Sequence, residues 1–157
     1  MITWALIILN GLIFILQTWF FDTDLFDLYF SLNLLFFEEN FLWQPLSSMF
    51  LHGNFTHLVL NMIVLFSFGR ILESYMGSVK FALLYFVGGL ITSLLSAFYL
   101  LFAFEFWGQK IFLVGASGAI CVLMGFLPLF MGINVAWYGH IFGFMSGYIL
   151  AFLRRKR

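Results

Sequence analysis

The chain has 157 residues, of which 64% are hydrophobic and only 9% are charged. Soluble domains carry about 25% charged residues, so the composition excludes a soluble globular protein and predicts one membrane domain over residues 1–157. Basic and acidic residues balance at seven each, which argues against nucleic-acid binding because that function needs a basic face. The single cysteine, Cys121, excludes an intrachain disulfide and a multi-cysteine metal site.

Five apolar runs reach the length of about 20 residues that a bilayer-spanning helix needs. The runs are 2–21, 46–68, 81–104, 111–131 and 133–153. The first run lacks a basic leader and a small-residue cleavage site, so we expect a retained helix rather than a cleaved signal. The five tryptophans fall at or near the ends of the runs, where interfacial aromatic residues lie. The pattern predicts an all-α bundle of about five membrane helices.

Residues 22–45, between the first two runs, hold five acidic residues among many aromatic ones. The segment is too polar to cross a bilayer and too apolar for an ordinary loop, so we predict short amphipathic helices in the membrane interface. Farther along the chain, ESYMGSVK at 73–80 predicts a short polar turn. The terminal RRKR predicts a basic anchor on the cytoplasmic side.

The second run contains His52, His57 and Asn61. His57 and Asn61 are four residues apart and therefore share one helix face. Each can donate a hydrogen bond, so the pair could stabilise an oxyanion, or it could bond to neighbouring helices as polar contacts inside the bundle. His52, close to the membrane surface, is expected to orient a loop.

The fourth run contains GASGA at 115–119. Gly115 and Gly118 place no side chains beside Ser117, so a substrate backbone or another helix can approach closely. A helix that begins here would offer free N–H groups suited to an anion. The motif is therefore either a small-residue packing face or the setting of a nucleophile.

The fifth run contains GHIFGFMSG, in which Gly143 and Gly147 form a small-residue face for helix contact. His140 shares that face, so it would meet another helix. A buried histidine there is either a structural residue bonded to a carbonyl or the general base of a serine. Ser117, His140 and the two donors of the second run together make the minimum set for acyl transfer.

These motifs resemble the rhomboid intramembrane serine proteases over residues 43 to about 150. WQPLSSMFLHGNFTHLVLNM resembles the end of the family's first loop and its second membrane helix, and GRILESYMGS resembles the turn that follows, with Glu73 and Gly77 at family positions. GASG matches the nucleophile motif, and GHIFGFMSG matches the final helix with its catalytic histidine.

The resemblance implies a dyad in which Ser117 attacks the scissile carbonyl and His140 is the base. It also implies an oxyanion hole made of His57, Asn61 and the Ser117 backbone N–H. The supporting residues would be Gly115, Gly118, Gly143 and His52. The implied function is an intramembrane serine endopeptidase that cleaves transmembrane segments of other proteins without a metal or cofactor, in a multi-pass protein of the bacterial inner (plasma) membrane.

Two residues depart from the family pattern. Gln44 replaces the arginine of the family's Trp-Arg pair, which begins here with Trp43. Cys121 stands one turn after the serine, where members often carry an aromatic residue that packs on the histidine.

The larger departure is one of length. The family core has six membrane helices, but only 23 residues separate Ser117 from His140, and crossing a bilayer and returning takes about 40. One straight helix would hold the two side chains about 35 Å apart. With a turn near Ile133, only an extended NVAWYG segment lets His140 reach the level of Ser117.

Five helices would also place RRKR outside, against the positive-inside tendency. Three arrangements remain open. A re-entrant or extended return after Met131 could complete the dyad within one chain. Two copies could exchange their last helix, which would make the protein a homo-oligomer. In the third arrangement, the alternative function, the chain is a proteolytically inactive rhomboid-like protein that binds membrane helices.

Overall fold

The computed structural model describes residues 1–108, 111–130 and 132. The chain divides into two units, Met1–Leu127 and Pro128–Arg157, and the first unit holds every described helix except the end of the last one. The predicted fifth run, with His140 and Gly143, lies outside the described residues, as does Lys110. The prediction of one domain over the whole chain therefore stays a prediction.

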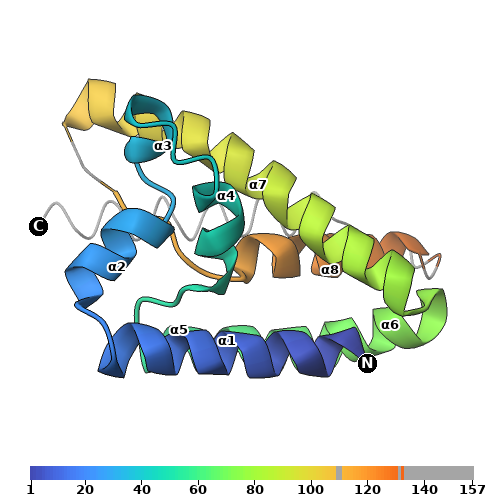
Figure 1. Ribbon diagram of the computed structural model, residues 1–157. Helices are drawn as coiled ribbons and strands as arrows, with labels where there is room; N and C mark the ends of the chain where they lie inside the picture. Colours follow the sequence, from blue (N-terminus) through green and yellow to red (C-terminus); the bar gives the residue numbers. More distant parts are fainter. Residues whose placement is uncertain (109–110, 131, 133–157) are drawn as a thin grey trace, which may run out of the picture. The chain divides into compact units, whose positions relative to one another are not determined.

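Helices form the regular secondary structure of the described residues, apart from one isolated β-bridge (Figure 1). In chain order they are α1 (Ile2–Trp19), α2 (Thr23–Phe30), α3 (Leu35–Glu38), α4 (Gln44–Ser47), the 3₁₀ turn η1 (Ser48–Phe50), α5 (Phe55–Val64), the π-helical turn η2 (Leu65–Gly69), α6 (Arg70–Met76), α7 (Ser78–Trp107) and α8 (Ser117–Phe130). The predicted all-α membrane architecture is confirmed.

Three of the described helices are long and apolar enough to cross a membrane: Ile2–Trp19, Phe55–Met76 and Ser78–Glu105. They correspond to the first three predicted runs. Only 22% to 28% of the most apolar stretch of each is buried within the protein. The remaining apolar surface faces outward, as expected of helices that lie in lipid.

The second span, Phe55–Met76, begins and ends later than the predicted 46–68. It begins later because Asn54 caps its first turn. The Asn54 backbone is extended, and its side chain accepts a hydrogen bond from the His57 N–H at 2.8 Å, which is the N-cap arrangement. From Phe55 the helix continues through the π-helical turn η2 to Met76.

The predicted polar turn at 73–80 is wrong, because all of these residues except Gly77 lie in helices. Residues through Met76 stay helical in α6, and the chain turns at Gly77, whose φ of 82° is tolerated by glycine. Ser78 already begins α7. Glu73 is buried at 4% exposure, so it belongs to the helix packing and not to a solvated loop.

The fourth predicted run, 111–131, is helical only from Ser117 onward. The residues before it are held by the segment between α1 and α5, here called the first loop. Leu113 pairs with Leu32 in an antiparallel bridge, with N···O distances of 2.9 and 3.0 Å, and the Gly115 N–H donates to the Ser48 carbonyl at 2.8 Å. Because the first loop satisfies these backbone groups, the chain need not be helical there.

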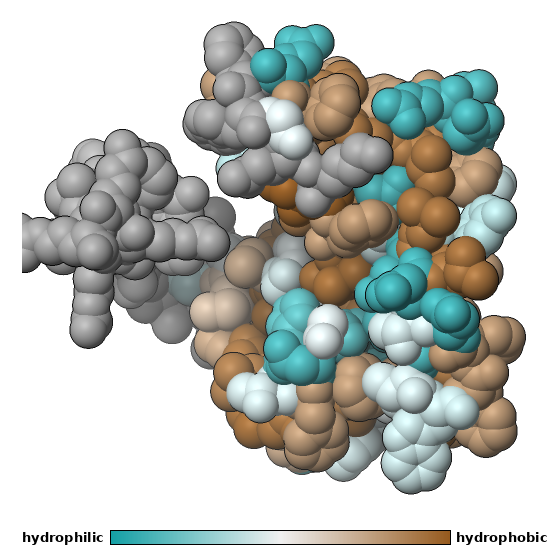
Figure 2. All heavy atoms as spheres, turned by 90° about the vertical axis from the view of Figure 1, so that its left-hand side faces the viewer, coloured by the Kyte–Doolittle hydropathy of each residue, from teal (hydrophilic) through white to brown (hydrophobic). Residues whose placement is uncertain are grey.

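The first loop contains the predicted short helices, which are α2, α3 and α4. Asp22 caps α2 by accepting from the N–H groups of Asp24 and Leu25. Figure 2 views the end of the molecule that carries α2, where hydrophilic side chains are mixed with hydrophobic ones. This mixed face fits the interfacial position that the sequence predicts.

Three polar side chains lie buried on one face of α1 at intervals of seven residues: Thr3, Asn10 and Gln17. We call this set the α1 polar face. Around it, α1 packs against a core with completely buried residues such as Leu65, Leu72, Phe81 and Tyr85. At one end of the face Thr3 bonds to Glu73, and at the other end Gln17 bonds to the first loop.

Candidate active site

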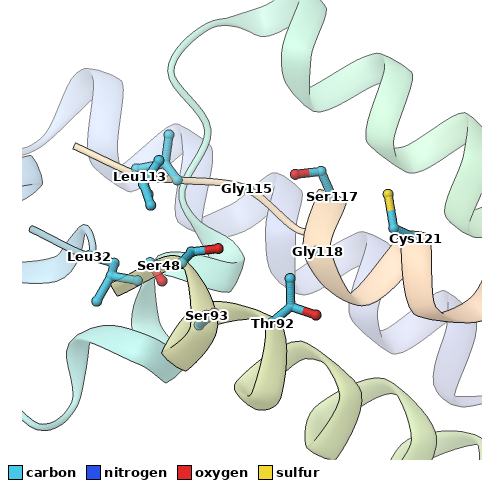
Figure 3. Close-up of a pocket in the computed structure, with 11 residues that line it drawn as sticks. Leu32, Ser48, Thr92, Ser93, Leu113, Gly115, Ser117, Gly118 and Cys121 are labelled. Atoms are coloured by element: carbon cyan, nitrogen blue, oxygen red, sulfur yellow. The ribbon is translucent and has the colours of Figure 1, made fainter. Parts of the chain in front are cut away.

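Ser117 is the first residue of α8, and its side chain is exposed in a pocket of about 260 Å³ (Figure 3). The walls come from three parts of the chain: the first loop, α7 and the segment around Ser117. They contribute Leu32 and Ser48; Thr92, Ser93 and Ser96; and Leu113, Val114, Gly115, Gly118 and Cys121. Four of these wall residues carry hydroxyl groups, so polar groups lie beside Ser117 in a pocket whose lining is otherwise mostly apolar.

Gly115 brings the oxyanion candidates of α5 to the segment that carries Ser117. A methyl group at Gly115 would lie 2.8 Å from Cε1 and 2.9 Å from Nε2 of His57, and 3.5 Å from Nδ2 of Asn61. The Gly115 φ is +122°, a conformation that L side chains rarely adopt. Glycine is therefore required here both by the backbone and by the contact with His57.

Asn61 lies one turn after His57 on α5 and is 8% exposed. Its Nδ2 is buried and has no hydrogen-bond partner among the described residues. Buried donors are nearly always paired in folded proteins, so this amide is available to a residue outside the described ones or to a bound molecule. An oxygen atom of a bound substrate would accept its hydrogen bond.

The start of α8 adds further donors close to Ser117. The first N–H groups of a helix have no partner inside it, and the positive end of the helix dipole lies there. Gly118 lets α8 approach α7, because a methyl group at Gly118 would lie 2.9 Å from the Cγ2 of Thr92. The close contact fixes the beginning of α8 against the hydroxyl-bearing wall of the pocket.

His52 lies in the first loop and is only 1% exposed. Its ring packs against the ring of His57 with centroids 5.1 Å apart, and its Nδ1 lies 3.3 Å from the Phe50 carbonyl. Burial, and then repulsion from the positive charge of His57, lower the pKa of His52 to about 4, although the Phe50 carbonyl acts in the opposite direction. His52 is therefore neutral at pH 7.

The lowered pKa of His52 predicts a loss of stability in acid. Between pH 6.5 and about 4 the unfolded chain protonates this imidazole while the folded chain does not, so the free energy of unfolding falls as the pH falls, by at most about 3 kcal/mol. Unfolding in detergent micelles at pH 7, 6, 5 and 4.5 measures the slope. His52→Gln should flatten it, whereas Asn10→Leu should leave it in place; an equal slope in His52→Gln contradicts the assignment.

The two departures from the family pattern have structural counterparts. Gln44 is completely buried, and its carboxamide accepts from the Asn33 N–H at 3.2 Å and donates to the Leu28 carbonyl at 3.2 Å. The neighbouring Trp43 donates from Nε1 to the Tyr29 carbonyl at 2.9 Å. Gln44 thus braces the first loop without an arginine. Cys121 is exposed in the same pocket as Ser117.

The structure brings His57 and Asn61 against Gly115, two residues before Ser117, and packs the His52 ring on His57. Gly118 packs on α7, and the other two site candidates, His140 and Gly143, lie outside the described residues. The distance from the Ser117 Oγ to the His140 imidazole is therefore not part of the described geometry. The catalytic and oxyanion roles stay predictions.

Sequence reasoning missed two sets of polar residues near the site. The first is the pocket wall of Ser48, Thr92, Ser93 and Ser96. The second is Gln17 of the α1 polar face, which bonds to the His52 backbone. Both sets carried a signal. Hydroxyl residues grouped within one apolar run, and polar residues repeated every seven positions in another, indicate a helix face that bonds to neighbouring segments.

Comparisons with known proteins cover the part of the chain that carries Ser117. The family model for the Rhomboid domain matches residues 39–131, which include His57, Asn61 and Ser117. The chain is 31% identical over 146 residues to "RHOMBOID-like protein 6, mitochondrial" of Arabidopsis thaliana, covering 74% of this chain and 45% of that protein. It is 39% identical over 88 residues to "RHOMBOID-like protein 5" of the same plant, covering 56% and 26%.

A bacterial protein is also similar. The chain is 28% identical over 137 residues to "Putative rhomboid protease YdcA" of Bacillus subtilis (strain 168), covering 71% of this chain and 66% of that protein. The chain spans less than half the length of the two plant relatives and just under two thirds of the bacterial one.

Proposed function

The chain belongs to the rhomboid family, and on that premise we propose that it is an intramembrane serine endopeptidase. Its substrates are transmembrane segments of other membrane proteins, and its catalytic pair is Ser117 and His140. It acts without a metal or cofactor, and we place it in the bacterial plasma membrane.

One observation carries this proposal. The buried Asn61 amide, which has no partner among the described residues, and the His57 ring both pack on Gly115, two residues before the exposed Ser117. A packing motif would leave no reason for an unpaired donor at this point. Donors held in place before the substrate arrives are what an oxyanion hole requires.

The reaction follows from these positions. Ser117 Oγ attacks the scissile carbonyl carbon while His140 takes its proton. The carbonyl oxygen becomes an oxyanion that accepts hydrogen bonds from Asn61, from His57 and from the Ser117 N–H. His140 then protonates the leaving amine, and water hydrolyses the acyl-enzyme. The hydroxyl groups that line the pocket favour the entry of that water.

Labelling with a fluorophosphonate probe tests the proposal, since the probe forms a P–O bond to an activated serine and releases fluoride. The wild-type chain in detergent should be labelled, and Ser117→Ala or His140→Ala should lower labelling by more than about 10³-fold. The matched control is Ser67→Ala, which removes an exposed serine bonded only to Ile63 of its own helix. Equal labelling of wild type and Ser117→Ala contradicts the proposal.

Mixing two inactive variants tests whether the His140 that pairs with Ser117 belongs to the same chain or to another copy. If copies exchange their last helix, Ser117→Ala co-expressed with His140→Ala should regain part of the labelling, because one copy supplies the serine and the other the histidine. If each chain completes its own dyad, the mixture stays inactive. A wild-type chain that binds a transmembrane segment but is never labelled would favour the alternative, a rhomboid-like protein that does not cleave.

A further inference from the structure

We propose that Gln17, on the membrane helix α1, is a positioning residue for the oxyanion side of the site. It holds the backbone at His52, and through the His52 ring it keeps His57 against Gly115. The catalytic consequence rests on the proposed function, whereas the positioning itself can be measured without activity.

The Gln17 side chain is 1% exposed and bonds at both ends of its carboxamide. Its Nε2 donates to Oδ1 of Asp27 in α2 at 2.8 Å, and its Oε1 accepts from the His52 N–H at 3.3 Å. The orientation of the amide is dictated by these partners, because a backbone N–H can only donate and an ionised carboxylate can only accept. One side chain thus ties α1 to two separate points of the first loop.

The second contact in this series joins the His52 ring to the His57 ring. The His52 ring is buried and meets the ring of His57 edge to face, with an interplanar angle of 65°. Its Nδ1 lies near the Phe50 carbonyl, and its Nε2 is buried without a partner among the described residues. The backbone bond to Gln17 therefore restrains a ring that has little other polar attachment.

The third contact joins His57 to Gly115, in the segment that carries Ser117. His57 has no free space on this side, since a single methyl group at Gly115 would approach its ring to 2.8 Å. Close-packed interiors transmit such displacements. A shift of His52 consequently moves His57 relative to Gly115, and an error of about 1 Å in a catalytic group can lower a rate by about 100-fold.

The first test compares Gln17→Leu with Asn10→Leu. Both variants remove a buried amide from the α1 polar face, but Asn10 donates to the Leu6 carbonyl of its own helix and makes no hydrogen bond to the first loop among the described residues. Gln17→Leu should slow phosphonylation of Ser117 by about 10- to 100-fold with little change in probe concentration at half-maximal rate. An equal effect of the two variants, or a rate loss that follows only the loss of thermal stability, overturns the proposal.

A compensating pair of substitutions keeps the test informative if Gln17→Leu folds poorly. In Gln17→Glu with Asp27→Asn, the new Asn donates where Asp27 accepted, and the new Glu still accepts from the His52 N–H. The pair should restore most of the rate, whereas Gln17→Glu alone faces the Asp27 carboxylate and should not. Failure of the folded pair to restore the rate overturns the proposal.

Imidazole ¹⁵N resonances separate this inference from the proposed function. They are assigned with His52→Gln and His57→Gln. Gln17→Leu should shift the His57 resonances, the compensating pair should return them, and Asn10→Leu should leave them unchanged. If wild-type Ser117 is never labelled, the proposed function fails while these shifts still support the positioning role; unshifted His57 resonances in Gln17→Leu overturn that role.

Discussion

Gly115→Ala is expected to lower phosphonylation and substrate cleavage by at least about 10²- to 10³-fold, the loss typical of removing one oxyanion donor. The new methyl group would lie 2.8 to 2.9 Å from the His57 ring and 3.5 Å from the Asn61 amide. The backbone would also be strained, because φ at this residue is +122°. Either the imidazole or the segment before Ser117 must move, and both define where the oxyanion would lie. Initial rates in detergent measure the effect.

Gly125→Ala, on the helix α8 that follows Gly115, provides the matched control. Among the described residues, and apart from its own helix backbone and its chain neighbours, no atom lies within 4 Å of the position of its added methyl group, and its φ is not positive. Its rate should equal that of the wild type, and its stability should rise by about 0.5 to 1 kcal/mol, since alanine favours a helix interior. If Gly115→Ala folds and retains the wild-type rate, His57 and Asn61 do not form the oxyanion hole.

Glu73→Ala is expected to lower the free energy of unfolding by about 3 to 5 kcal/mol, the range for losing a buried charged partner. The buried carboxylate accepts four hydrogen bonds: from the N–H groups of Ile2 and Thr3 at 2.6 and 2.9 Å, and from the hydroxyls of Thr3 and Ser78 at 2.7 and 2.6 Å. Hydrogen bonds to a charged group contribute about 1.5 to 3 kcal/mol each. Removing the carboxylate leaves all four donors buried or partly buried without it.

Two further variants should lower the free energy of unfolding by less than Glu73→Ala does. Thr3→Val deletes one of the four donors and should cost less than half as much. Glu39→Ala removes an exposed carboxylate and should change stability by less than about 0.5 kcal/mol. Denaturing-detergent titration measures all three, and a loss in Glu73→Ala no larger than in Glu39→Ala would show that this carboxylate does not join α1 to α6.

Hydropathy predicted the three membrane spans found among the described residues, but it placed the ends of the second one poorly. The free energy of burying apolar residues in lipid depends on a stretch of about 20 residues, so it does not register a single capping side chain. Asn54 and Gly77 decide where the second span begins and ends. The GASGA motif correctly indicated a helix start near Ser117, whereas the hydropathy of the fourth run placed it too early, because the first loop binds the backbone before Ser117.

The candidate site likewise contains residues that the sequence indicates and residues that it does not. Ser117, His57 and Asn61 could be predicted because their motifs are local in the sequence. Gln17 and Ser48 could not, since their roles arise from contacts with residues far away in the chain, at His52 and Gly115. A polar residue in an apolar run indicates that a partner exists, but it does not identify that partner.

The α1 polar face also constrains how the protein is made. Glu73 is synthesised 70 residues after Thr3, and His52 is synthesised 35 residues after Gln17. Until then the Thr3 hydroxyl and the Gln17 Oε1 lack these partners, and unpaired polar groups are costly in the bilayer. Helices inserted one at a time must afterwards associate through such contacts. Thr3 and Gln17 therefore favour keeping α1 near the insertion machinery until Glu73 and His52 have been made. In this order α1 moves fully into lipid only together with the later helices.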